Sequence, residues 1–237
     1  MSQTSEFAGR TALITGGTTG IGLGIGRGLA ALGVRVIAAG LPGSGTPEPG
    51  IEVRDLDVSA PEQVTNLVAS LDSLDILVNC AGIIRRDEEF DPAVFERVID
   101  INLNGTMRMC VAAKSLLRQS QGSVVNIASM LTFFGGPRVP AYSASKGGIA
   151  QLTRSLAVAW AAEGIRVNAV APGWISTPLT HALQADPQRS APILSRTPMG
   201  RWGLPEDVAG PVIFLCSKAA AFVTGVVLPV DGGYSVS

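Results

Sequence analysis

The sequence has few charged residues, few aromatic residues and almost no histidine. Charged residues make up 16% of its 237 residues and aromatic residues 5%, and His181 is the single histidine. Lys and Arg number 18 against 19 for Asp and Glu, so the chain has no strong field that would attract nucleic acid or an anionic membrane. The expected partners are therefore small molecules and further copies of the same chain.

Cysteine is also scarce. Cys80, Cys110 and Cys216 are an odd number without disulfide or metal-ligand spacing, and one histidine leaves no Cys/His cluster. We expect free thiols in a reducing cytoplasm and no metal site. Residues 1–10 lack the pattern of a signal peptide, and no apolar stretch approaches the length of a membrane span.

Short runs of β-branched residues alternate with longer helical stretches. This alternation, with 46% hydrophobic residues, predicts one Rossmann-like α/β domain over residues 1–237, with helices on both faces of a parallel sheet. The expected strands are Thr11–Thr15, Val34–Ala39, Ile51–Arg54, Ile76–Asn79, Ser123–Ala128, Arg166–Ala171 and Val226–Val230. The expected helices are Gly20–Leu32, Ala60–Ser70, Pro92–Gln119, Ala141–Glu163 and Pro205–Ser217.

Local signals mark where some of these elements begin or fail. Ser59 followed by Glu62 predicts a capping box, and Asp91 before Pro92 predicts the start of the next helix. Residues 40–50 contain four Gly and three Pro, so the crossover between the second and third strands should lack its helix. One face of the sheet at this crossover would then be covered by loop. The shorter connection would also alter the rim of a cofactor site beside these strands.

A glycine-rich loop, Thr15-Gly16-Gly17-Thr18-Thr19-Gly20-Ile21-Gly22, follows the first strand and leads into a helix. Such glycines let the backbone approach a pyrophosphate, whose charge the helix N-terminus favours. The strand before and the helix after it indicate a dinucleotide site rather than a tight turn alone. Gly24, Gly26 and Gly28 continue the run inside the helix, where they indicate close packing of the helix on the sheet and not contact with phosphate.

Tyr142 and Lys146 are four residues apart, which places both on one face of a helix. A phenol is a weak acid, but a nearby cation favours its phenolate and lowers its pKa. Ser129 precedes them at the carboxyl end of a predicted strand, where its hydroxyl could polarise the same substrate oxygen. The three residues predict proton transfer to or from a substrate hydroxyl or carbonyl.

Nearly the whole chain resembles the short-chain dehydrogenase/reductase family. The matching pieces, in order, are Thr15 to Gly22, Asp57-Val58, Asn79-Cys80-Ala81-Gly82, Asn102, Ser129, Tyr142 with Lys146, Pro172-Gly173 and Asp231-Gly232-Gly233. Cys80 stands where the family commonly has a second Asn, which is a minor departure. The resemblance implies an NAD(P)-dependent oxidoreductase and a homotetramer built from Pro92–Gln119, Ala141–Glu163 and the C-terminal segment.

The resemblance also implies roles for individual residues. Tyr142 would be the acid/base, Ser129 would orient the substrate oxygen, Lys146 would hold the nicotinamide ribose and tune Tyr142, and Asn102 would anchor a water. Asp57 would meet the adenine amino group, Val58 its ring, and Asn79 would secure the central strands. The full set expected to bind the cofactor is Gly16, Thr18, Thr19, Gly20, Ile21, Gly22, Gly40, Asp57, Val58, Asn79, Ala81, Gly82, Tyr142, Lys146, Pro172, Gly173, Ile175 and Thr177.

Further stretches are similar to the branch of the family that oxidises deoxy-keto-gluconates and related sugar acids. They are Ala81 to Arg86, Ile127 to Met130, Gly135 to Pro140, Arg189 to Ala191 and Gly200 to Pro205. An acidic sugar needs a cation for its carboxylate, and Arg suits it through paired hydrogen bonds. The expected substrate-binding residues are Ser129, Tyr142 and Arg138, with Arg85 and Arg189 as further candidates.

His181 is expected to be structural or exposed.

Two other functions remain open. A 3-oxoacyl-[acyl-carrier-protein] reductase would use the hydrophobic Phe133, Phe134 and Trp174 to admit an acyl chain. A catalytically silent dinucleotide-binding sensor would normally have lost Tyr142 or Lys146, and both are present.

The cofactor is expected to be NAD, with NADP possible. An NAD site usually has an acid at the end of the second strand, but Gly40 stands there. An NADP site would offer a cation beside Gly40 or before Gly20, yet the residues are Leu41 and Thr19. Leaving the 2′-phosphate of NADP without a partner weakens its binding, so NAD is favoured unless Arg54 or a residue from another subunit reaches the rim of the site.

Overall fold

The computed structural model describes residues 6–45 and 48–237. Within these residues seven parallel strands form one sheet in the order β3-β2-β1-β4-β5-β6-β7. The strands are β1 (Thr11–Thr15), β2 (Arg35–Gly40), β3 (Ile51–Asp55), β4 (Ile76–Asn79), β5 (Ser123–Ile127), β6 (Arg166–Pro172) and β7 (Val227–Val230). The predicted Rossmann-like sheet is confirmed, and each strand end lies within one residue of its expected place.

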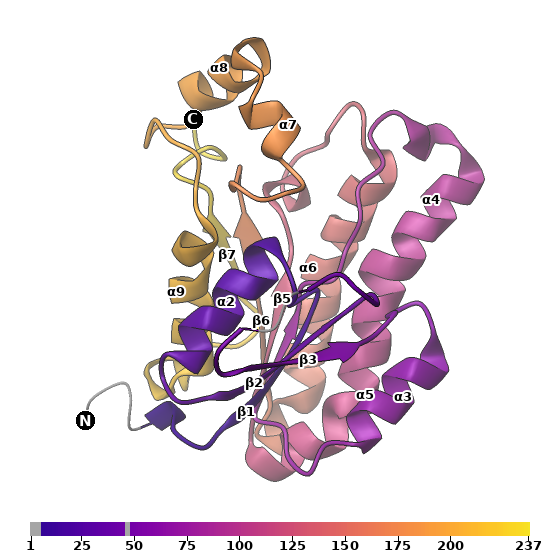
Figure 1. Ribbon diagram of the computed structural model, residues 1–237, viewed down its shortest axis with the longest axis vertical. Coiled ribbons are helices and arrows are strands. Elements are labelled where there is room, and N and C mark those ends of the chain that lie inside the picture. Colours follow the sequence, from indigo (N-terminus) through magenta and orange to yellow (C-terminus); the bar gives the residue numbers. More distant parts are fainter. Residues whose placement is uncertain (1–5, 46–47) are drawn as a thin grey trace.

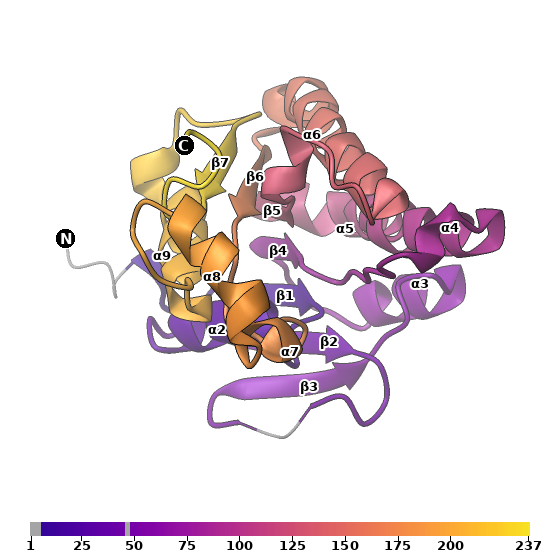
Figure 2. The same cartoon turned by 90° about the horizontal axis from the view of Figure 1, so that it is seen from above.

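Helices cover both faces of the sheet (Figure 2), with α2 and α9 on one face and α3, α5 and α6 on the other. Their bounds are α2 (Gly20–Ala30), α3 (Pro61–Ala69), α4 (Pro92–Ile99), α5 (Gly105–Ser120), α6 (Pro140–Trp160), α7 (His181–Gln184), α8 (Pro187–Arg196) and α9 (Pro205–Cys216). The sequence patterns did not indicate α7 or α8. No helix among the described residues is long and apolar enough to cross a membrane.

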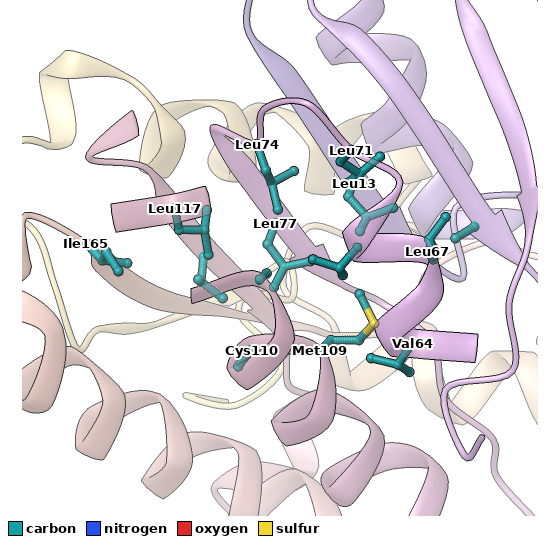
Figure 3. Close-up of a cluster of buried hydrophobic side chains, with 14 of the residues drawn as sticks. Leu13, Val64, Leu67, Leu71, Leu74, Leu77, Met109, Cys110, Leu117 and Ile165 are labelled. Atoms are coloured by element: carbon teal, nitrogen blue, oxygen red, sulfur yellow. The ribbon is translucent and has the colours of Figure 1, made fainter. Parts of the chain in front are cut away.

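The core lies between the sheet and its helices because the central strands are buried on both sides. Leu13 and Leu77 on β1 and β4 face α3 and α5, where they join Leu67, Met109 and Leu117 (Figure 3). The alternate residues of the same strands pack against α2 and α9. This double burial explains why these strands are nearly continuous apolar runs.

The expected helix starts had different outcomes. Asp91 caps α4, because its Oδ1 accepts the Ala93 N–H at 2.8 Å. The predicted capping box at Ser59 and Glu62 is wrong: Ala60 is the N-cap of α3, and Ser59 Oγ donates to Asp57 Oδ1 at 2.6 Å. Ser59 precedes the N-cap by one residue, so its hydroxyl is not at the position that bonds the N2 or N3 N–H, and it binds Asp57 instead.

The helix expected over Pro92–Gln119 is interrupted. A π-helical turn, Asp100–Asn104, separates α4 from α5. This turn carries Asn102, whose side chain bonds both backbone groups of Ile83. A π turn holds one residue more than an α-helical turn, and such turns are frequent at functional sites.

Residues 41–45 and 48–50 of the crossover between β2 and β3 contain no helix, as expected. An ion pair between Arg27 of α2 and Glu48 fastens this loop across the helix. The helical glycines do allow close packing, but only Gly26 packs on the sheet. A Cβ at Gly24 would lie 2.4 Å from Pro205 Cβ, and one at Gly28 would lie 3.1 Å from Ile213 Cδ1, so both face α9.

Candidate active site

The candidate residues gather at the carboxyl ends of the strands. The sheet order reverses between β1 and β4, and such switch points create a crevice for ligands. The segment with α7 and α8 lies above these strand ends (Figure 1). The fold therefore brings the glycine-rich loop, the catalytic candidates and the segment after β6 to one edge.

The glycine-rich loop fits a dinucleotide because side chains are excluded there. Gly16 has φ 63°, and a Cβ on it would lie 2.8 Å from the Ala81 nitrogen. A Cβ on Gly22 would lie 2.2 Å from the Gly16 carbonyl oxygen. The bare backbone leads directly into the N-terminus of α2, after Thr19 in extended conformation. This arrangement leaves N–H groups and a helix dipole for a pyrophosphate.

Polar side chains fasten the strand ends around that loop. Thr15 Oγ1 accepts the backbone N–H groups of Cys80 and Ala81, each at 3.2 Å. Asn79 Nδ2 donates to Asn126 Oδ1 at 2.9 Å, which ties β4 to β5. Asn79 Oδ1 is buried and has no hydrogen-bond partner in the described chain. An unsatisfied buried acceptor here fits a site that a ligand completes.

The other residues expected to bind the cofactor lie along the same edge. Asp57 Oδ1 accepts from the backbone and hydroxyl of Ser59, while Val58 is buried and lies within 3 Å of where a Gly105 Cβ would be. The segment after β6 returns to the glycine-rich loop, because a Cβ on Gly20 would lie 3.4 Å from Thr177 Cβ. The structure thus brings Thr177 beside the loop.

Tyr142 and Lys146 lie on one face of α6, with Lys146 Nζ 5.5 Å from the centre of the Tyr142 ring. Ser129 follows β5, and its hydroxyl acts on the Tyr142 phenol as a hydrogen-bonding partner that lowers its pKa. Thr132 joins the Ser129 turn to α6, since Thr132 Oγ1 donates to the Lys146 carbonyl at 3.0 Å. The three predicted residues therefore meet.

Burial dominates the electrostatics of the pair. It raises the pKa of Tyr142 to about 12, although Ser129 and the Arg86 cation oppose this shift. It lowers the pKa of Lys146 to about 8. The Lys146 ammonium donates to the Ile127 carbonyl at 2.6 Å. The sequence argument placed the lowering of the Tyr142 pKa on Lys146, whereas in the structure Ser129 and Arg86 act in that direction.

Asn102 connects the active-site helix to the loop after β4. Its Oδ1 accepts the Ile83 N–H at 2.8 Å, and its Nδ2 donates to the Ile83 carbonyl at 2.9 Å and to Ser145 Oγ at 3.1 Å. Ser145 Oγ in turn donates to the Tyr142 carbonyl at 2.7 Å. The amide thus spans from the loop to the first turns of α6.

A cavity of about 470 Å³ opens beside Tyr142 and Ser129. This volume suits a small molecule. Its lining includes four arginines: Arg86, Arg138, Arg189 and Arg196. Arg138 lies in the lining as expected, but Asp87 already holds its guanidinium, with Arg138 Nε donating to Asp87 Oδ1 at 2.7 Å. Arg85 is exposed and lies outside the lining.

Arg86 differs from Arg138. It is half-buried and has no hydrogen bond or ion pair from its side chain within the described residues. Burial lowers the pKa of its guanidinium, and the charges of Arg138 and Arg189 lower it further. A partly desolvated cation beside two others is a site that an anion would stabilise.

Part of the cavity wall is aromatic, formed by Phe134, Trp174 and Tyr234. Trp174 packs edge-on against Trp202 and Tyr234, and the Arg196 guanidinium lies 4.3 Å from the centre of the Tyr234 ring. Phe134 lines the cavity, whereas Phe133 lies outside it and is exposed. His181 begins α7 and is exposed, as expected.

Sequence reasoning missed two residues here: Arg86, which lines the cavity, and Glu89, whose Oε2 accepts the backbone N–H of Tyr142 at 2.8 Å. Both lie between β4 and α4, where Arg86 is in a loop and Glu89 is in a single 3₁₀ turn, Glu88–Phe90, and such short pieces have no periodicity that tells which side chain faces inward. Arg85 and Arg86 are adjacent and identical in type, so the pattern could not choose between them. Glu89 stands among Asp87, Glu88 and Asp91, a run that resembles a solvated acidic surface.

Comparisons with known proteins agree with this geometry. The family model described as enoyl-(acyl carrier protein) reductase matches residues 16–235, and the chain belongs to the short-chain dehydrogenase/reductase family. It is an oxidoreductase of the NAD(P)-dependent kind that acts on CH–OH groups. The chain is 42% identical to a 2-dehydro-3-deoxy-D-gluconate 5-dehydrogenase of Bacillus subtilis, with 97% of this chain and 96% of that protein covered.

Two solved structures are also similar. One, from Agrobacterium tumefaciens, was proposed to be a 2-deoxy-D-gluconate 3-dehydrogenase and contains NADP; it has a TM-score of 0.89 and 43% identity over 98% of this chain and 99% of that one. The other is a gluconate 5-dehydrogenase from Burkholderia cenocepacia in complex with NADP and tartrate. It has a TM-score of 0.90 and 33% identity, and all of both chains is covered.

Proposed function

We propose that the chain oxidises a secondary alcohol of a sugar acid such as 2-dehydro-3-deoxy-D-gluconate, and reduces the corresponding ketone. The observation that carries this proposal is Arg86, a half-buried cation in the cavity that holds Tyr142, whose guanidinium has no partner among residues 6–45 and 48–237. A carboxylate bound to Arg86 places the hydroxyls of the same molecule toward Tyr142 and Ser129. Sugar-acid names among similar proteins support the same substrate class.

In this proposal Tyr142 takes the hydroxyl proton as the phenolate during oxidation and returns it as the phenol during reduction, while Ser129 orients the same oxygen. Lys146 holds the ribose of the cofactor, and Asn102 anchors a water that receives the proton. The bound nicotinamide supplies the hydride chemistry. Neutral Tyr142 is the acid for reduction, and its raised pKa keeps it protonated near neutral pH.

Arg86→Gln should raise KM for a sugar acid by about tenfold to a hundredfold, because a charge-assisted hydrogen bond contributes about 1.5–3 kcal/mol. The amide of the same acid should show an almost unchanged KM, because it has no charge to lose. Steady-state kinetics with each acid and its amide measure the difference.

Arg85→Gln provides the matched control, since it removes the same charge one residue away from an exposed position outside the cavity. It should leave both KM values near those of the wild type. Equal changes for the acid and the amide in Arg86→Gln would remove Arg86 from the carboxylate site and leave Arg138 as the residue to test next.

The cofactor is a nicotinamide dinucleotide, NAD or NADP, and we propose that the enzyme prefers NAD. β2 ends at Gly40, opposite Asp55 of β3, and the segment 40–50 contains neither Lys nor Arg. The Arg54 guanidinium pairs with Glu52 at 2.5 Å, which supports the proposal that it does not serve the 2′-phosphate. The hydroxyls of Thr18 and Ser44, 3.0 Å apart, line this rim and are neutral. The two similar structures above contain NADP, so this preference needs a direct measurement.

The wild type should show a higher kcat/KM with NAD than with NADP. Leu41→Arg should then raise kcat/KM for NADP by about tenfold, since Leu41 is exposed just after β2 and a guanidinium there can bind the 2′-phosphate. Leu41→Gln is the uncharged control. A clear NADP preference of the wild type would show that a cation elsewhere lines the rim.

We also propose a cytoplasmic homotetramer. Several large apolar side chains are exposed on α4, α5 and α6, namely Phe95, Met107, Val111 and Val158. An exposed apolar face on these helices suits contact with another copy. The absence of an extreme net charge agrees with such self-association.

A further inference from the structure

Glu89 is a carboxylate in the interior of the protein. It is 1% exposed, although the residues on either side of it, Glu88 and Phe90, are exposed. No ion pair joins it to a Lys or Arg of the described chain. Burying a carboxylate costs free energy unless hydrogen bonds satisfy its oxygens, so Glu89 needs hydrogen-bond donors other than Lys or Arg.

The two carboxylate oxygens bind two different segments. Oε1 accepts the backbone N–H of Arg85 at 2.8 Å, and Oε2 accepts the backbone N–H of Tyr142 at 2.8 Å. The Tyr142 N–H belongs to the first turn of α6, whose amides have no partner within the helix. Val139, the N-cap of α6, makes no side-chain capping bond. Glu89 therefore caps the catalytic helix from a separate segment, the 3₁₀ turn Glu88–Phe90.

The same carboxylate fixes the segment that carries Arg86. Arg85 is bonded to Glu89, and Ile83 is bonded through both backbone groups to Asn102. Arg86 follows directly, in the lining of the cavity. We propose that Glu89 is a positioning residue that sets the place of Tyr142 with one oxygen and that of Arg86 with the other. The part that concerns Arg86 rests on the sugar-acid function proposed above.

The charge of Glu89 has a separate effect on Tyr142. The groups that act on the phenol are Ser129, Cys80, Arg86 and Glu89, with the Lys146 ammonium near its ring. The negative charge of Glu89 raises the pKa of Tyr142, whereas Arg86 lowers it. Removing the Glu89 charge should thus favour the phenolate, and this distinguishes Glu89 from a residue that only holds the fold.

Glu89→Gln keeps the size of the side chain but leaves one backbone N–H facing an amide NH₂ group. We expect kcat to fall about tenfold to a hundredfold, for a sugar acid and for an uncharged secondary alcohol alike, because an unsatisfied buried donor displaces the reacting group. KM for the acid should rise more than KM for its amide, while the Kd for the cofactor should stay unchanged. Glu88→Gln, an equal change of charge at an exposed neighbour, should alter kcat by less than about twofold.

The pH profile supplies the second readout. In Glu89→Gln the rising limb of log kcat for oxidation should move to lower pH, because the phenolate forms more easily. Glu89→Asp keeps the charge but is shorter by one methylene, so it should lose kcat without moving that limb. Circular dichroism gives the folded fraction for each variant, and the rates are compared per folded enzyme.

Wild-type kcat in Glu89→Gln, or a loss that disappears per folded enzyme, would overturn the proposal. An unmoved limb together with a normal acid-to-amide KM ratio would overturn it as well. The kcat measured on an uncharged alcohol does not depend on the sugar-acid assignment. If the wild type showed no preference for acids over amides, the proposed function would fail while the effect of Glu89 on kcat would remain.

Discussion

Tyr142→Phe is expected to lose about two to four orders of magnitude in kcat, the range that a positioned general acid or base contributes. The phenyl ring keeps the shape and the contact with Lys146, 5.5 Å from the ring centre, so only the proton-carrying hydroxyl is removed. Cofactor affinity and folding should be close to those of the wild type. Pre-steady-state and steady-state rates of NAD(P)H formation measure the loss.

The second tyrosine of the sequence provides the control. Tyr234 also lines the cavity, but it lies on the aromatic wall against Trp174 and Arg196. Tyr234→Phe should therefore change kcat far less than Tyr142→Phe. A Tyr142→Phe enzyme with wild-type turnover would assign the proton transfer to another group.

Gly22→Ala is expected to disrupt the cofactor loop. The new methyl group would lie 2.2 Å from the Gly16 oxygen and 2.9 Å from Gly17 Cα, and these are backbone atoms that cannot move without opening the loop. Overpacking of this kind costs about 1–3 kcal/mol or more, which corresponds to a tenfold to hundredfold rise in the cofactor Kd if it falls on binding. Calorimetric titration with the cofactor and a thermal melt separate the effect on binding from that on stability.

Gly26→Ala is the matched control on the same helix. Its methyl group would lie 3.4 Å from the Ile51 Cδ1 atom, an ordinary contact with a flexible side chain. Because Ala favours helix over Gly by about 1 kcal/mol, this variant should bind the cofactor normally and unfold at an equal or higher temperature. Normal cofactor binding by Gly22→Ala would show that the loop tolerates a side chain and does not closely approach a phosphate.

The sequence predicted those parts that depend on repeated patterns. A short segment is enough to show a repeat or a fixed spacing of residues. Such patterns mark the apolar strands, the glycine-rich loop and the four-residue spacing of Tyr142 and Lys146. These patterns were enough to predict three features of the structure. They are the sheet, the loop with no helix before β3, and the meeting of Ser129 with Tyr142.

Features set by tertiary contacts were not predictable in this way. The sequence over the π turn at Asp100–Asn104 is compatible with an unbroken helix, and the bonds from Asn102 to Ile83 that accompany the turn are tertiary contacts. Ser59 has the capping-box spacing, but Asp57 competes successfully for its hydroxyl. Glu89 binds backbone amides that lie 4 and 53 positions away in the sequence, so no local pattern could reveal it.

The most direct test of the account is the kcat/KM of the wild-type enzyme, measured side by side for a sugar acid, its amide and a 3-oxoacyl thioester, each with both nicotinamide cofactors. Phe134 and Trp174 could contact an acyl chain, but the Arg86 cation, which has no partner in the described part of the chain, favours the acid. The account predicts the highest kcat/KM for the sugar acid, by about tenfold or more over its amide. A higher kcat/KM for the thioester, or equal values for the acid and the amide, would contradict it.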